Sequence, residues 1–161
     1  MTPEQILSRT RDALRVLVWP GTANKVFGPS SVYVVGDTPI MALSQYAKPC
    51  AFVVDQGTLS HDEHPGLQIQ NFTIMLFVEN IAQNYGEGGV LGRNRVPDTS
   101  SGAGLKAIEK EVLTDLVKQI TLSTDKVVLV SKNISKSAFI GHNVPLYFAS
   151  LVFNAYCWSV Y

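Results

Sequence analysis

The segment at residues 67–80, LQIQNFTIMLFVEN, is the stretch of this 161-residue chain that decides the fold. From its middle onward the even positions are all apolar: Phe72, Ile74, Leu76 and Val78. A period of two puts these side chains on one face of a β-strand, so they predict a core face. The other face has Thr73 at its centre but becomes apolar at Met75 and Phe77. We therefore expect a long strand with one buried face and a second face that is partly apolar.

The segments before this strand predict a partner for it. Residues 50–54 are an apolar run typical of a strand, and a polar connection at residues 57–66 follows. Two such runs joined by a loop indicate an antiparallel pair. Shorter β-like pieces are expected at residues 26–27 and 32–35, separated by a Gly-Pro turn signal.

Two more strands are predicted toward the C-terminus. Residues 126–131 indicate a strand, and residues 132–137 a turn. Residues 146–160 predict a long final strand with alternating faces. Its predicted core face consists of Ala149, Leu151, Phe153, Ala155 and Cys157.

Two helices complete the predicted elements. Thr2 and Gln5 form a Thr-x-x-Gln capping box, with Pro3 suited to the first helical position, and Pro20-Gly21 ends this region. The second helix, at residues 105–120, has an apolar stripe at helical spacing: Leu105, Ile108, Val112, Leu116 and Ile120. The order of elements predicts a single α+β domain over residues 1–161, a mostly antiparallel sheet with the two main helices packed on one face.

A long segment between the two halves of the sheet lacks periodicity. Residues 81–104 are rich in glycine, and we expect a flexible loop there. Loops of this length in a compact domain are usually functional or disordered. We therefore regard it as a candidate interaction loop, with four residues as its candidate contacts: Tyr85, Glu87, Arg93 and Arg95.

Composition narrows the function classes. Hydrophobic residues make up 46% of the chain and charged residues 16%, which is typical of a globular protein. The thirteen basic and thirteen acidic residues balance, and this argues against nucleic-acid binding as the main task. Both cysteines, Cys50 and Cys157, lie in predicted strands and are interpreted as buried apolar residues, with their proximity left open. The first residues do not resemble a secretory signal, so we expect synthesis in the cytoplasm.

The predicted strands are long for a domain of this size. Residues 146–160 would span roughly 50 Å as a strand, whereas the whole domain should be roughly 40 Å across. Either the long strands bend at bulges or they project beyond the domain to meet a neighbour. Because both faces carry apolar residues, we favour a neighbour.

One cluster has the composition of a metal site. His61, Asp62, Glu63 and His64 could supply metal ligands, and this supports an alternative function as a metal-dependent hydrolase using the two histidines. The spacing is not that of a His-Glu-x-x-His motif, and His142 lies far away in the sequence. We therefore favour a solvated connection between strands, and predict neither a metal nor any other cofactor.

The remaining motifs also favour a protein that is not an enzyme. The glycine-rich run at residues 86–92 has Leu91 where a dinucleotide-binding motif needs glycine, and it lacks the Lys-Ser/Thr of a P-loop. A nucleophile elbow is absent as well. We predict no catalytic residues.

The order of elements resembles that of the tail terminator (tail completion) proteins of long-tailed bacteriophages. A capped helix leads into strands, and the strand with FTIMLFVE runs into a glycine-rich loop. An amphipathic helix from Leu105 follows, and YFASLVF lies in the last strand. The resemblance covers most of the chain and rests on element order and length rather than on a short motif.

This resemblance implies a structural virion protein. Such proteins form a homohexameric ring on the tail tube, end tube polymerisation, and join the tail to the head connector or head-completion protein. The expected partners are therefore further copies of the chain, the tail tube protein and the connector, with only passive contact to DNA in the lumen and none to a membrane. The implied location is the head–tail junction of the virion, after assembly in the host cytoplasm. Another head–tail connector or neck (head-closure) protein is the neighbouring alternative.

Overall fold

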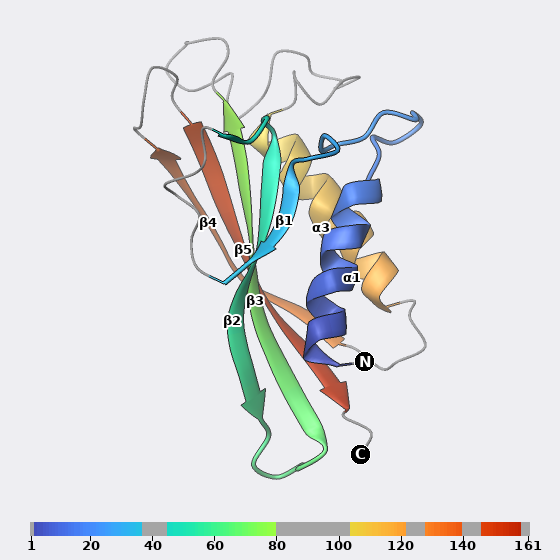
Figure 1. Ribbon diagram of the computed structural model, residues 1–161, viewed down its shortest axis with the longest axis vertical. Coiled ribbons are helices and arrows are strands. Elements are labelled where there is room, and N and C mark those ends of the chain that lie inside the picture. Colours follow the sequence, from blue (N-terminus) through green and yellow to red (C-terminus); the bar gives the residue numbers. More distant parts are fainter. Residues whose placement is uncertain (1, 37–44, 80–103, 122–127, 140–145, 159–161) are drawn as a thin grey trace.

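The chain folds as an α+β domain around a mixed sheet. The computed structural model describes residues 2–36, 45–79, 104–121, 128–139 and 146–158 (Figure 1). Along the chain the elements are α1 (Pro3–Val16), β1 (Val32–Val35), β2 (Cys50–Ser60), β3 (Leu67–Glu79), α3 (Leu105–Thr121), β4 (Val128–Phe139) and β5 (Leu146–Trp158). The strand order is β1-β2-β3-β5-β4. β1 runs parallel to β2, and the β2–β3, β3–β5 and β4–β5 pairs are antiparallel.

One face of the sheet forms the main core. The predicted core residues of β3 and β5 are buried there, and apolar residues of both helices belong to the same cluster. Phe72 and Phe153 are opposite one another in the β3–β5 register, and their rings stack 5.4 Å apart. β3 and β5 pair over their full length from Leu67↔Trp158 to Glu79↔Leu146. These two strands therefore form the centre of the fold, as their alternating sequences predict.

The opposite face has a smaller apolar cluster. Cys50, Phe52 and Phe77 are buried there, together with Val54. The rings of Phe52 and Phe77 lie 5.9 Å apart, and those of Phe77 and Phe148 lie 5.7 Å apart. The partly apolar second face predicted for β3 is thus confirmed at the end that carries Phe77.

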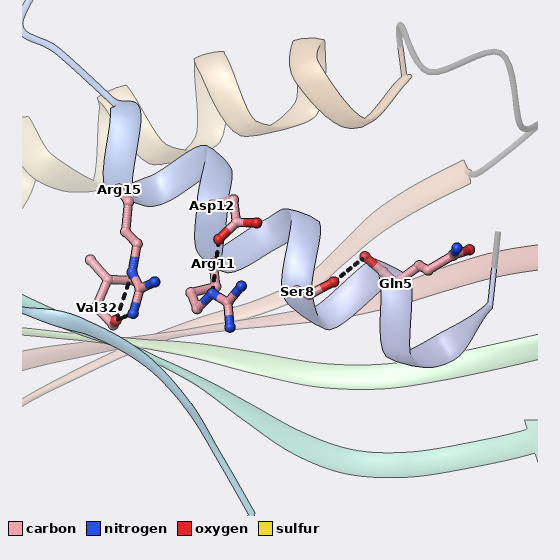
Figure 2. A network of polar contacts seen from close by, with 6 residues as sticks. All are labelled: Gln5, Ser8, Arg11, Asp12, Arg15 and Val32. Atoms are coloured by element: carbon pink, nitrogen blue, oxygen red, sulfur yellow. Dashed lines mark hydrogen bonds and ion pairs between the residues drawn. The ribbon is translucent and has the colours of Figure 1, made fainter.

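Helix α1 begins and attaches to the sheet through specific polar contacts. The capping box is present, since the Thr2 hydroxyl accepts from the Gln5 amide at 3.2 Å and the Gln5 side chain accepts from the Thr2 amide at 2.9 Å. Near the other end, the Arg15 guanidinium donates to the Val32 carbonyl oxygen at 2.8 and 3.2 Å (Figure 2). The same guanidinium lies 5.8 Å from the centre of the Tyr33 ring. Arg15 therefore connects the last turn of α1 to the start of β1.

Three predicted segments differ in the structure. β2 continues to Ser60, so the connection to β3 is shorter than the predicted connection at residues 57–66. The sequence did not show this because a strand exposed to solvent on both faces does not need alternating apolar residues. β4 is one strand from Val128 to Phe139, and a register shift between Ser131 and Ile134 replaces the predicted turn at residues 132–137. Residues 26–27 form no strand, and this region has only an isolated bridge between Val18 and Lys25.

None of the helices in the described part of the chain is long and apolar enough to cross a membrane.

Candidate functional site

The most distinctive feature of the described structure is the far half of the β2–β3 hairpin. We call residues 55–70 the arm. Figure 1 shows that it extends beyond the N-terminal end of α1, at the bottom of the view. All six residues from Asp55 to Ser60 are exposed, whereas the five from Cys50 to Val54 are buried. The arm therefore projects from the core instead of contributing to it.

A β-bulge marks the base of the arm. The register between β2 and β3 shifts between Asp55 and Thr58. Gly57 lies within the shift with φ of 99°, a conformation that residues with a side chain rarely adopt. The Asp55 carboxylate accepts a hydrogen bond from the Gly57 amide at 2.9 Å. The sequence Asp-Gln-Gly thus forms a local turn within the strand, which allows β2 to continue past the core.

The side chain of Gln70 holds this bulge against β3. Gln70 is 1% exposed, and its Oε1 accepts from the Thr58 hydroxyl at 2.9 Å. Its Nε2 donates to the Asp55 carboxylate at 2.8 Å and to the carbonyl oxygens of Gly57 and Asn71 at 3.2 and 2.8 Å. A buried amide with these partners fixes the direction of the arm.

The outer edge of the arm has no neighbouring strand among the described residues. β1 pairs only with residues Ala51 to Val54 of β2, so Thr58, Leu59 and Ser60 pair with β3 alone. The His61 amide donates to the Leu67 carbonyl oxygen at 3.1 Å. Because hydrogen-bonded and non-hydrogen-bonded pairs alternate in an antiparallel ladder, the backbone groups of Thr58 and Ser60 point away from β3.

The tip of the arm contains the two histidines of the candidate metal site. The His64 amide donates to the His61 carbonyl oxygen at 3.3 Å, and the Leu67 amide donates to the His64 carbonyl oxygen at 2.8 Å. These turns bring the two imidazole rings to 5.1 Å in a stacked arrangement. In residues 2–36, 45–79, 104–121, 128–139 and 146–158, no group of three His, Cys, Asp or Glu side chains could hold a metal ion. His142 lies outside these ranges.

The arm is acidic. It carries Asp55, Asp62 and Glu63, all exposed, and its sequence contains no lysine or arginine. It also has the most exposed large apolar side chain of the described structure, Leu59, at 58%. The arm thus combines exposed acidic residues, one exposed leucine and an edge that no strand among the described residues covers.

The candidate interaction loop lies almost entirely outside the described residues. Its four residues, Tyr85, Glu87, Arg93 and Arg95, lie outside the described residues, as does the glycine-rich run at residues 86–92.

The two cysteines, Cys50 and Cys157, lie far apart in the structure. Both are buried free thiols. Cys50 pairs with Phe77 and Cys157 with Gln68, so they lie nine positions apart along β3, about 30 Å. They also belong to the clusters on opposite faces. Burial raises the pKa of the Cys157 thiol, which makes it a poor nucleophile.

No known protein family has a model that matches this chain, and no curated protein matches it. Function therefore rests on the geometry of the chain itself. The length of the predicted strand at residues 67–80 indicated projection beyond the domain, but the sequence did not predict the exposed half of β2. Gln70 gave one further signal: it is a polar residue on the same strand face as Phe72 and Ile74. A buried polar side chain at such a position needs partners, and here it finds them in the bulge.

Proposed function

We propose that this chain is a structural virion protein rather than an enzyme. In this proposal it forms a homohexameric ring at the head-proximal end of a phage tail tube. The ring ends tube polymerisation and joins the tail to the head connector, and DNA passes through its lumen without specific contacts. It belongs to the head–tail junction of the virion and is assembled in the host cytoplasm.

The observation that carries this proposal is the arm. Residues from Asp55 to Ser60 are ordered as a strand, yet all are exposed and lie beyond the strand that covers the rest of β2. An isolated protein usually shortens, charges or covers such an edge because it invites pairing with other chains. Here the arm carries acidic residues, but among the described residues its edge is neither shortened nor covered, and Gln70 holds the strand in place. A rigid, open edge is what a subunit of a larger assembly requires.

The layer arrangement agrees with this function. We infer a predominantly antiparallel sheet with both helices on one face, since residues of α1 and α3 share one buried cluster with β3 and β5. Within the described residues, this arrangement buries apolar side chains of both helices and leaves two sheet edges and the arm for neighbouring subunits. The resemblance to tail terminator proteins in element order implies that these neighbouring subunits are copies of the same chain.

The test is the effect of the purified chain on growing tail tubes. Tail tube protein from a long-tailed phage is polymerised with and without the chain, and tube lengths are measured by negative-stain electron microscopy. We expect tubes to stop growing and to show added density at one end. An unrelated monomeric protein of the same mass is the control. Tubes that keep the control length and have bare ends would contradict the proposal. In a parallel binding assay with the head connector, binding without any effect on tubes would indicate the head-closure alternative.

A further inference from the structure

We propose that the outer edge of the arm pairs with the outer edge of β4 in a second copy of this chain. The sheets of successive subunits would then join edge to edge. This inference deepens the ring proposal, on which it rests, by naming the two surfaces that meet.

The first surface is the open edge of the arm. The backbone groups of Thr58 and Ser60 point away from β3, and β1 ends beside Val54. Six residues from Asp55 to Ser60 span about 20 Å, which is enough for a short added strand. Leu59, 58% exposed in the single chain, would lose part of that exposure to the neighbour.

The second surface is the opposite end of the sheet. β4 is the last strand in the order β1-β2-β3-β5-β4 and, within the described residues, it pairs only with β5. It is twelve residues long, about 40 Å, so its outer edge can accommodate the whole arm strand. Within the described residues, the sheet thus has one open edge at each side.

Charge distinguishes the possible pairings of these edges. The arm carries Asp55, Asp62 and Glu63 without a basic residue, whereas the sequence of β4 contains Lys132 and Lys136 without an acidic residue. Two arms side by side would bring acids together, and two β4 strands would bring lysines together. Only the pairing of an arm with β4 joins opposite charges.

This choice has a consequence for the assembly. Pairing of an arm with β4 uses two different surfaces, so each subunit still has one free surface of each kind after the first contact. Such contacts form a closed ring when the rotation between subunits is right. A symmetric dimer through either edge would instead end the assembly at two copies.

The experiment is a charge exchange between the two edges. An arm variant carries Asp62→Lys and Glu63→Lys, and a β4 variant carries Lys132→Glu and Lys136→Glu. Self-association is measured by analytical ultracentrifugation at low ionic strength. Each variant alone should associate at least roughly tenfold more weakly than the wild type, as expected for two surface charge pairs. A control with Glu4→Lys and Asp12→Lys makes the same change of charge as the arm variant, but on α1, and should associate like the wild type.

The decisive measurement uses an equal mixture of the two variants. In the mixture each arm finds a β4 of opposite charge on the other variant, so association should return to near the wild-type level. Asp62 and Glu63 are exposed at the tip of the arm, and circular dichroism checks that each variant is folded. A mixture that associates no better than the single variants would overturn the edge pairing.

A backbone variant tests the pairing without using charge. Ser60→Pro removes an amide that points outward, and Ser60→Ala keeps it. We expect the proline variant to associate more weakly and the alanine variant to match the wild type. If the wild type forms rings and both the charge variants and Ser60→Pro associate normally, the edge pairing is wrong while the ring proposal stands. If the wild type never associates, even with tail tubes, both are wrong.

Discussion

Replacement of Gln70 by alanine should release the arm from the core. The buried amide makes hydrogen bonds to Asp55, Gly57, Thr58 and Asn71. Three of these partners are exposed residues that can bond to water instead, so each lost bond costs at the lower end of the usual range, about 0.5 kcal/mol. The buried methylene groups add about 1 kcal/mol. The free energy of unfolding should therefore fall by about 2–3 kcal/mol, and Tm by roughly 4–12 °C for a chain of this length.

Urea denaturation gives the total loss, and amide hydrogen exchange shows where it falls. Protection should drop most at Leu59 and Ile69, which face each other in the arm, and least at Ile74 in the centre of β3. Gln68→Ala is the matched control, because Gln68 is a half-buried glutamine two positions away on the same strand, outside this network. It should cost less than about 1 kcal/mol.

Two results would refute this reasoning. If Gln68→Ala destabilised the chain as much as Gln70→Ala, the hydrogen bonds of the bulge would have no special role. If Gln70→Ala reduced protection at Ile74 as strongly as at Leu59, the arm and the core would form one cooperative unit.

Three further predictions concern the core, the first helix and the buried ionisable groups. Phe153→Ala should lower the free energy of unfolding by about 3–5 kcal/mol in urea denaturation, because it leaves a cavity beside a stacked ring; a loss below about 1 kcal/mol would contradict its buried position. Thr2→Ala removes one side of the capping box and should cost about 1 kcal/mol in the same assay, with no change expected if the cap does not form in solution. Burial raises the pKa of Glu109 above its ordinary value of 4.5, so the folded chain holds this proton more tightly. Stability should then fall as the pH rises from that value through the raised pKa, and Glu109→Gln should remove this component of the pH profile.

The alternating strands could be predicted because burial of one face places an apolar residue at every second position of the sequence. Phe72, Ile74, Leu76 and Val78 face the main core as expected, and so do the apolar positions of β5. The start of α1 followed from the same logic, since its Thr-x-x-Gln capping box is a local interaction that needs no distant partner.

The strand Asp55–Ser60 of the arm could not be predicted, because the contacts that hold it are not local. The composition of Asp55–Ser60 is typical of a loop. These residues form a strand because their backbone pairs with β3 and because Gln70 binds the residues of the bulge. The sequence also predicts a turn at residues 132–137, where β4 continues, because an edge strand can contain Ser and Lys residues that are typical of turns. The sequence offered His61 and His64 only as candidate metal ligands, and their spacing did not show that their rings stack.

The solution mass of the purified chain tests the central claim most directly. Size-exclusion chromatography with light scattering measures the mass without any partner, and a second run follows incubation with tail tubes. The account predicts six copies of the 17.6 kDa chain, either alone or as rings recovered on tubes. A species that stays at 17.6 kDa at all concentrations and never associates with tubes would contradict it.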